Sequence, residues 1–401
     1  MNDLVNMERV KSYFQELSEL SILEEDGGYT RLAFSDQEKA AHQWLKDKLK
    51  KISCTVHQDS VGNVFGRYGS DYEPSLAFGS HLDTVPHGGL FDGALGVIAG
   101  LECLTRFSEQ RIKTTHPLEL ICFTGEETNP LGGTFGSRAM AGLLERSDAY
   151  EKRLHECSFS WTDVEAARKT KSDFIHFLEL HIEQGNVLET VQKKIGVPNA
   201  IAGMLRLAVT IHGKAAHAGT TPMTLRQDAL IAAADLIKRV NQLALESEGA
   251  LVATVGEIHA APNVPSVVPG EVHLIVEIRG IDWSSVQSAG QSVTDWLESR
   301  SGNVDVKKLV EKYPCELSNS LQDEITMYCS EHHIPFHQMF SGANHDSNAM
   351  STLCDTGMIF VPSKDGISHH PDEFTSWDDI EIGINTLIGT IYGLCTDGRT
   401  H

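Results

Sequence analysis

The chain has 401 residues and a formal net charge of −22 at pH 7. This length exceeds what one hydrophobic core usually serves, so we expect two domains. Nucleic acids and anionic membranes attract basic surfaces, and the acidic balance argues against both as partners. No apolar run approaches the roughly 18–20 residues that cross a bilayer, and no signal-peptide pattern stands at the amino terminus. The eight cysteines are scattered without a Cys-x-x-Cys pair. We therefore expect a cytoplasmic protein with reduced thiols.

Helix and strand signals alternate through the first third of the chain. Ser35 and Glu38 have the spacing of a capping box, with Ser35 as the N-cap of a helix. Gly62 and Asn63 stand where a hairpin turn is expected between two strands. The patterns predict helices at 4–22, 35–49 and 94–107, and strands within 54–68, 75–78 and 117–123. This alternation is typical of a mainly parallel sheet covered by helices.

The pattern changes near residue 200, where a compact α+β unit is expected. Its predicted elements are strands at 206–212, 251–258 and 271–279 and helices at 225–243 and 284–300. The pattern of a sheet covered by helices then returns, with a helix expected at 322–332 and a buried strand at 358–361. We therefore predict an α/β protein. Its larger domain, a helix-covered mixed sheet formed by 1–203 and 314–401, is interrupted by a smaller α+β domain at 204–313.

The first motif with metal-binding chemistry joins His81 and Asp92. His81 ends an apolar run, and Asp92 follows eleven positions later, after a loop rich in glycine and proline. Imidazole and carboxylate are ligands of transition metals, and the carboxyl ends of strands are where open α/β sheets build their sites. A core histidine and a turn aspartate would explain this pair equally well. Asp83 would lie on the same face as His81, where it could hold the imidazole tautomer.

The second motif is the acidic pair Glu126 and Glu127, directly after the strand at 117–123. Such acids are usually solvated loop residues. At the sheet edge that also carries His81, one carboxylate could bind a metal while its neighbour acts as general base on water.

Two further motifs bring histidines to the same edge. Glu179, His181 and Glu183 alternate on one face of a strand, which an amphipathic edge strand would also explain. His369 and His370 precede a proline, for which we predict extended backbone. The residues themselves do not choose between these two histidines.

Taken together, the motifs offer five ligands, which is one too many for a single tetrahedral zinc. They suit two metals bridged by a carboxylate and a water. The set is His81, Asp92, Glu127, His181 and either His369 or His370, with Glu126 left free.

In this order, the motifs resemble the amidase/hydantoinase/carbamoylase family of the dinuclear-metal aminoacylase and carboxypeptidase clan. The resemblance covers nearly the whole chain and rests on 79–86, 89–97, Glu126-Glu127, 135–138, 179–185 and Ser368-His369-x-Pro-x-Glu373. It implies a catalytic domain interrupted by a lid or dimerisation domain, which would be 204–313.

The resemblance also implies a role for each matched residue in the metal site. His81 would bind one metal and Asp92 would bridge both, while Glu127, His181 and His369 would complete the set. His369 is favoured over His370 because the family pattern places histidine directly after serine. Glu126 would be the general base, and Asp83 would support the site. The resemblance implies two divalent ions per chain, zinc or manganese, although cobalt and nickel also accept these ligands.

Other matched residues would bind substrate. His217 resembles a histidine that reaches the active site of a partner chain and stabilises an oxyanion, which implies a homodimer. Gln184 and Arg279 resemble residues that hold a substrate with a free carboxylate. Ser266 stands where the family normally has asparagine. Asn344, beside Gly342 in the expected pocket, stands where glycine is usual.

The function implied is hydrolysis of a linear amide C–N bond, with an N-carbamoyl-L-amino acid giving the amino acid, ammonia and CO₂. Allantoate or another ureido acid is the closest alternative, and an N-acyl-amino acid or dipeptide is a further one. The segment 128–130, after the paired acids, also departs from the family pattern. A non-catalytic metal- or ligand-binding protein on the same scaffold would require a damaged ligand or base. No matched metal or base position departs from the pattern.

Overall fold

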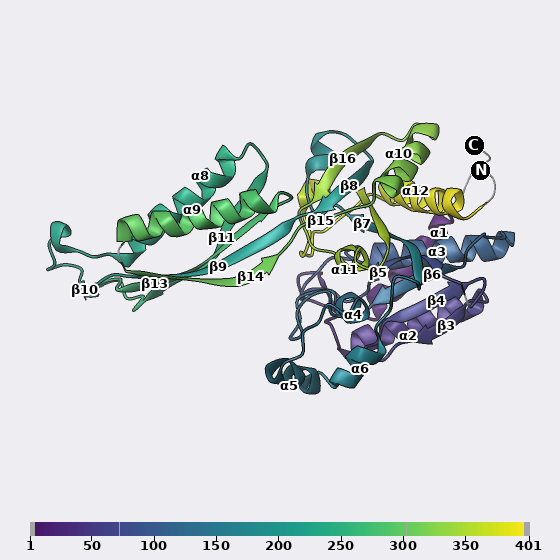
Figure 1. The fold of residues 1–401 in the computed structure, drawn as a ribbon, viewed down its shortest axis with the longest axis horizontal. Helices are drawn as coiled ribbons and strands as arrows, with labels where there is room; N and C mark the ends of the chain where they lie inside the picture. The colour runs from purple at the N-terminus through teal and green to yellow at the C-terminus, as the bar shows by residue number, and fades with distance from the viewer. Residues whose placement is uncertain (1–4, 72, 302, 397–401) are drawn as a thin grey trace. The chain divides into compact units, whose positions relative to one another are not determined.

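The computed structural model describes residues 5–71, 73–301 and 303–396. The chain divides into two compact units, one formed by residues 1–199 and 316–401 and the other by residues 200–315. The insertion predicted at 204–313 lies within the second unit. The predicted α/β class is confirmed, since each unit has helices packed on a sheet (Figure 1).

The larger unit is organised around a mixed sheet. Within the described residues it has nine strands in the order β15-β8-β17-β7-β5-β6-β4-β3, with β16 paired to β8. The central pairs, β17 with β7, β7 with β5 and β5 with β6, are parallel, whereas β17 with β8, β6 with β4 and β4 with β3 are antiparallel. The strands are β3 (Thr55–Gln58), β4 (Val64–Tyr68), β5 (Ser75–His81), β6 (Leu118–Phe123), β7 (Phe174–Ile182), β8 (Ile195–Ile201), β15 (Cys315–Glu316), β16 (Phe336–Ser341) and β17 (Asp355–Val361).

The central strands are apolar because both faces of the sheet are covered. Alternate residues of β6 enter different cores: Leu120 joins the cluster beneath the long helices, and Ile121 joins the cluster on the other face. The first face is covered by α1 (Met7–Glu19), α2 (Asp36–Lys51), α3 (Ala94–Gln110), α10 (Asn319–Glu331) and α12 (Trp377–Cys395). The second is covered by α4 (Phe135–Met140) and α11 (Asp346–Met350).

Short elements complete the larger unit. They are β1 (Ile22–Leu23), β2 (Tyr29–Thr30), α5 (Asp148–Glu156), α6 (Trp161–Ala166), α7 (Val187–Thr190) and the 3₁₀ turn η2 (Lys364–Gly366).

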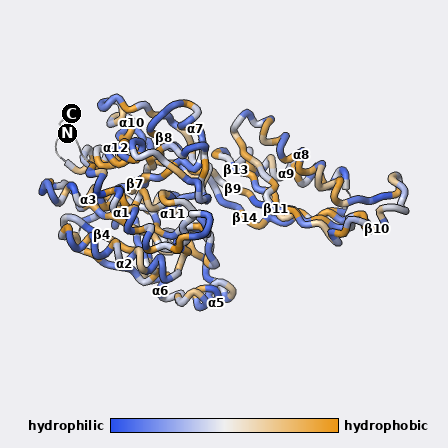
Figure 2. The backbone as a smooth tube through the Cα atoms, turned by 180° about the vertical axis from the view of Figure 1, so that it is seen from behind, coloured by the Kyte–Doolittle hydropathy of each residue, from blue (hydrophilic) through white to orange (hydrophobic). Residues whose placement is uncertain are grey.

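The second unit is an antiparallel sheet with two helices on one face (Figure 1). The sheet order is β11-β13-β9-β14, and β9 alternates strictly between buried and half-buried residues. Figure 2 shows hydrophobic and hydrophilic residues interleaved along both helices, as amphipathic packing requires. The elements are β9 (Gly203–His212), β10 (Ala216–His217), η1 (Met223–Leu225), α8 (Ala229–Glu246), β11 (Leu251–Ala261), β12 (Val267–Val268), β13 (Glu271–Gly280), α9 (Trp283–Ser301) and β14 (Val304–Lys312).

Two local predictions differ from the structure. The helix expected from Leu225 begins at Ala229, because Asp228 caps it by accepting from Leu230 N. Ser35 caps α2 as predicted, but the capping box is incomplete: the carboxylate of Glu38 accepts from the backbone N–H groups of Phe34 and Gly125 instead of Ser35. None of the helices in the described ranges is long and apolar enough to cross a membrane.

Gly96 allows α3 to approach the ends of β5 and β7. A Cβ atom at this position would lie 2.6 Å from the carbonyl oxygen of Leu180 and 2.7 Å from the Cβ of Ser80. Neither atom is the far end of a flexible side chain, so the helix itself would have to move. The close packing of α3 on the sheet therefore depends on this glycine.

We predict that Gly96→Ala destabilises the larger unit by about 1–3 kcal/mol through overpacking, despite the better helix propensity of alanine. Chemical denaturation followed by circular dichroism measures this. Gly256→Ala is the control, since nothing lies within 4 Å of a Cβ atom there. An unchanged midpoint for Gly96→Ala would contradict the packing argument.

Candidate metal centre

The parallel registers bring the sequence motifs to one edge of the sheet. His81 is the last residue of β5 and pairs with Phe123 at the end of β6, directly before the loop that carries Glu126 and Glu127. His181 lies one residue before the end of β7. Because the three strands run in the same direction, their carboxyl ends present these side chains together.

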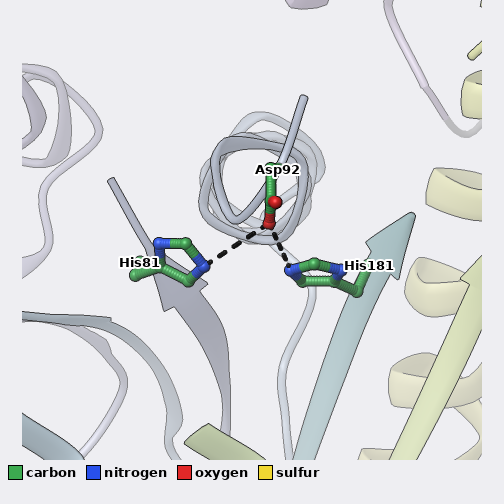
Figure 3. A group of neighbouring side chains, drawn as sticks. All are labelled: His81, Asp92 and His181. Carbon is green, nitrogen blue, oxygen red and sulfur yellow. Dashed lines mark ion pairs between the residues drawn. The ribbon is translucent and has the colours of Figure 1, made fainter. Parts of the chain in front are cut away.

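Asp92 lies between two histidines, two residues before α3 begins (Figure 3). Its Oδ1 atom is 3.2 Å from Nε2 of His181 and 3.8 Å from Nε2 of His81. All three side chains are buried. Their ligand atoms lie close enough together to hold one metal ion.

The other oxygen of Asp92 belongs to a second group. Oδ2 is 3.1 Å from Nε2 of His369, and that nitrogen is 3.3 Å from Oε1 of Glu127. Asp92, Glu127 and His369 form a further group that could hold a metal ion. His370 is exposed, and its Nδ1 accepts from the backbone N–H of Asp372. The structure thus turns His369, and not His370, toward Asp92.

The extended backbone predicted for the two histidines is wrong for His369, whose φ is 55°. This left-handed conformation is uncommon for a residue with a Cβ atom and is often found at functional sites. The strain is offset here by the contacts of the imidazole with Asp92 and Glu127.

The tautomers fit metal binding. Nδ1 of His81 lies 3.0 Å from the carbonyl oxygen of Asp83, and Nδ1 of His181 lies 2.9 Å from that of Ile182. A carbonyl oxygen only accepts, so each Nδ1 carries the hydrogen and each neutral ring has its lone pair on Nε2, on the side of Asp92. The Nε2 of His181 also accepts from the N–H of Gly93 at 3.2 Å. A lone pair facing a carboxylate requires a positive charge between them, which a proton or a metal ion can supply.

The electrostatics also favour cations. Although burial opposes a charged ring, Asp83, Glu126 and Asp92 raise the pKa of His81 well above its usual value. Hydrogen bonds to Asp92 and Glu127 raise the pKa of His369 to about 10. The carboxylates that favour a proton on these rings would equally favour a divalent ion, which takes such nitrogen and oxygen ligands.

Asp83 supports the acidic pair through the backbone. Its Oδ1 accepts from the N–H of Glu126 at 3.1 Å and its Oδ2 from the N–H of Glu127 at 2.9 Å. Oδ1 also lies 3.4 Å from Nδ1 of His81. One buried carboxylate therefore binds the backbone of both glutamates and contacts the His81 imidazole. The sequence predicted only that Asp83 could hold the tautomer of this imidazole.

The carboxylate of Glu126 lies beside His81 and is suited to proton transfer. Its Oε2 lies 3.7 Å from Nε2 of His81. Burial raises the pKa of Glu126 well above its usual value, and the negative charges of Glu127, Asp346 and Asp83 add to this against the attraction of His81. A raised carboxyl pKa is the property expected of a general base that must later act as an acid.

The predicted face of β7 is used differently by its two glutamates. Glu179 accepts from the hydroxyls of Ser80 and Ser347, at 2.8 and 2.7 Å. Glu183 lies beyond the strand and accepts from the N–H groups of Val187 and Leu188, at the start of α7. Only His181 of the alternating set is directed toward Asp92.

Sequence analysis missed His345 and the role of Glu373. His345 packs edge-on against His181 with ring centroids 4.6 Å apart, and burial and the charge of His181 hold its pKa well below the usual value. Glu373 accepts from the N–H groups of Phe91 and Asp92, at 3.0 and 3.1 Å. The only sequence signal was their position inside or beside the quoted motifs, because the chain does not reveal such long-range contacts.

Among the predicted substrate residues, Gln184 lies at the candidate metal-ligand group. Its Nε2 donates to Oδ2 of Asp92 at 2.9 Å, and its Oε1 is buried without a hydrogen-bond partner in the described part of the chain. Gly342 and Asn344 lie in the loop after β16. Gly342 is exposed and Asn344 is half-buried.

The remaining predicted residues belong to the second unit. His217 is exposed, and its Nδ1 accepts from the N–H groups of Gly219 and Thr220, so Nε2 carries the hydrogen of the neutral ring. The carbonyl of Ser266 accepts from Ala218 N, beside His217. Ser266 and His217 are therefore neighbours at one end of this unit.

Arg279 lies at the other end of β13. Its Nε donates to Glu277 at 2.8 Å. It is eight positions from Glu271, which pairs with His212 near the segment that carries His217. At the rise of an extended strand this separation is about 26 Å. Within one copy of this unit, Arg279 and His217 cannot contact the same small molecule.

Comparisons with known proteins agree with the predicted resemblance. Residues 77–392 match a profile described as peptidase family M20/M25/M40. An N-carbamoyl-L-amino-acid amidohydrolase of Paenarthrobacter aurescens is 35% identical, over 96% of this chain and 98% of the relative. An allantoate amidohydrolase of Bacillus subtilis (strain 168) is 32% identical, over 92% of this chain and 93% of the relative.

The fold is shared with a solved structure. A crystal structure of an amidase of the hydantoinase/carbamoylase family from Burkholderia multivorans has a TM-score of 0.86 and 29% identity, over 97% of this chain and 98% of that chain. The profile match spans well over half of the sequence, and the relatives align over nearly all of it. The chain therefore belongs to peptidase family M20/M25/M40.

Proposed function

We propose that the protein is a metal-dependent amidohydrolase that uses two divalent ions, zinc or manganese, to cleave an N-carbamoyl-L-amino acid. The observation that carries this proposal is the sharing of Asp92 between two groups of candidate ligands. Its Oδ1 lies beside Nε2 of His81 and His181, and its Oδ2 lies beside Nε2 of His369, which also contacts Glu127. Two ions bound there would polarise the substrate carbonyl and lower the pKa of water. Cobalt and nickel would suit the same ligands.

The residues of the chain would then move the protons. Glu126 takes a proton from the attacking water as the new C–O bond forms, and it delivers that proton to the nitrogen that leaves as the C–N bond breaks. For an N-carbamoyl-L-amino acid the leaving group is ammonia, and the carbamate that remains gives CO₂ and the amino acid. Asp83 keeps Glu126 in place through its backbone N–H.

Gln184 and Arg279 are proposed to hold the substrate. The buried Oε1 of Gln184 has no partner among the described residues and is available to accept from a ureido N–H group. A guanidinium can bind a free carboxylate in bidentate fashion, which is the proposed role of Arg279. Gly342 and Asn344 would contact the same substrate, and Ser266, which lies beside His217, would do so from the partner chain.

We also propose a homodimer in which His217 stabilises the oxyanion in the partner's site. The separation of His217 and Arg279 supports it, because one small substrate could touch both groups only if they came from different chains. The Nε2 hydrogen of His217 is the donor that such a role requires. The acidic composition and scattered cysteines support a cytoplasmic location.

Allantoate is the second candidate, since the relatives include an allantoate amidohydrolase. An assay on metal-loaded protein separates the candidates by scoring ammonia from N-carbamoyl-L-amino acids and from allantoate, and free amine from N-acyl-amino acids. We expect the highest kcat/KM with an N-carbamoyl-L-amino acid. A higher value with allantoate would replace the substrate assignment, and free amine without ammonia would overturn the ureido class.

We predict that Glu126→Gln lowers kcat by about 10²–10⁴-fold, because glutamine cannot accept the proton. Metal content, measured by elemental analysis, should stay at the wild-type value since Glu126 is not among the proposed ligands. Glu145→Gln, at an exposed position, is the control and should keep full activity. Undiminished turnover in Glu126→Gln would remove this residue from the mechanism.

The neighbouring histidines provide a matched pair. We predict that His369→Ala loses one metal equivalent and at least about 100-fold in kcat/KM, because it removes a ligand. His370→Ala should keep both metal ions and most of the activity, since its ring faces Asp372. Metal titration and kinetics of both variants check this, and the reverse pattern would reassign the ligand.

A further inference from the structure

Three consecutive backbone N–H groups after β6 all donate to buried carboxylates. Asp83 accepts from Glu126 and Glu127, and Glu38, on α2, accepts from Gly125 at 2.8 Å. Glu38 is 1% exposed. It lies outside the segment 77–392 that matches the family profile. The turn that carries the proposed base is therefore held from two separate parts of the chain.

Glu38 also fixes what packs against this turn. Its second oxygen accepts from the N–H of Phe34. Gly125 has a left-handed φ of 62°, and a Cβ atom there would lie 2.8 Å from Cε1 of Phe34. The carboxylate thus ties the Phe34 backbone and the Gly125 backbone together, with the phenyl ring closing over the glycine.

The carbonyl side of the turn is held as well. Nδ2 of Asn129 donates to the carbonyl oxygens of Gly125 and Glu127, both at 2.8 Å. With its N–H groups and carbonyls both bound, the turn has little freedom to rotate a peptide plane. The orientation of these peptide planes determines the direction in which the Glu126 side chain leaves the backbone.

This arrangement has an electrostatic cost. Glu38 and Asp83 are both buried and repel each other, so burial and the Asp83 charge raise the pKa of Glu38 to about 8. The buried guanidinium of Arg31 is the nearby countercharge, and it donates to the carbonyl oxygen of Leu82, next to Asp83. Buried carboxylates contribute little to the stability of the fold. The main contribution of Glu38 is therefore to the geometry of the turn.

We infer that Glu38 is a positioning residue for the base: by holding the N–H of Gly125, it sets the direction from which Glu126 meets its proton donor. The inference rests on the proposed function, in which Glu126 is the base. Within the described ranges, the hydrogen-bond partners of the Glu38 carboxyl group are the N–H groups of Phe34 and Gly125 and not a proposed metal-ligand side chain, so Glu38 is linked to the base through the backbone of the turn.

The test is Glu38→Gln with a matched control, Glu102→Gln. Glu102 is also a fully buried carboxylate that accepts from a backbone N–H, that of Asn6, but it anchors α1 and not the catalytic turn. For Glu38→Gln we expect kcat to fall about 10–100-fold, the loss typical of a base displaced by about 1 Å. KM and metal content should stay within about threefold of wild type. Glu102→Gln should lower the melting temperature but leave kcat unchanged.

Hydrogen exchange of the amides of 125–127 provides a readout independent of turnover. We expect these amides to exchange at least about tenfold faster in Glu38→Gln than in wild type, and at the wild-type rate in Glu102→Gln. If Glu38→Gln does not fold, Glu38→Asp keeps a carboxyl group near Arg31 but shortens the side chain by ~1.5 Å, and the same losses of kcat and of exchange protection are expected.

Wild-type kcat in the Glu38 variant, or an equal loss in Glu102→Gln, would overturn the inference. So would unchanged exchange of the turn. If wild-type protein hydrolyses none of the amides offered, the proposed function fails, while the exchange rates still decide whether Glu38 holds the turn.

Discussion

The carboxylate of Asp92 is the interaction on which the candidate site depends. It receives hydrogen bonds from Gln184 and Ser368 and lies beside the Nε2 atoms of three histidines. Its own backbone N–H donates to Glu373. Burial opposes ionisation of Asp92, but hydrogen bonds from His181 and His369 and the positive charges of His181 and His81 hold its pKa well below its usual value. The surroundings of this ionised aspartate therefore favour positive charge, carried either by protons on the imidazole rings or by a bound cation.

Around this centre, the other buried acids act mainly on the backbone. Asp83, Glu38 and Glu373 each accept from two backbone N–H groups of loops that carry proposed ligands or the base, or that pack against them. Carboxylates that accept from N–H groups form stronger hydrogen bonds than neutral acceptors. The price is mutual repulsion within a small volume, which Arg31 and the histidines partly offset. The loops at this edge of the sheet are thus held in place by buried acidic side chains.

Much of this could be predicted from local pattern. The apolar runs ending at His81 and Phe123 predicted strands, and parallel strands necessarily bring their carboxyl ends together. What could not be predicted depends on contacts distant in sequence. Glu38 looked like half of a capping box because its true partner, Gly125, is far along the chain. Glu179 shares the face of His181 by alternation, yet Ser347 binds it. The left-handed backbone of His369 has no signal in its neighbours.

The adjacency of Glu126 and Glu127 has a consequence for the choice of ion. The two residues share a peptide bond, and Asp83 binds the N–H of this bond and the N–H of the peptide bond before it. A proposed ligand and the proposed base therefore move as one rigid body. A larger ion that displaced Glu127 would displace Glu126 with it, so replacing one divalent ion by a larger one would change the position of the proposed base as well as that of the proposed ligand. The protein's preference among metals would then be set by the stiffness of one turn.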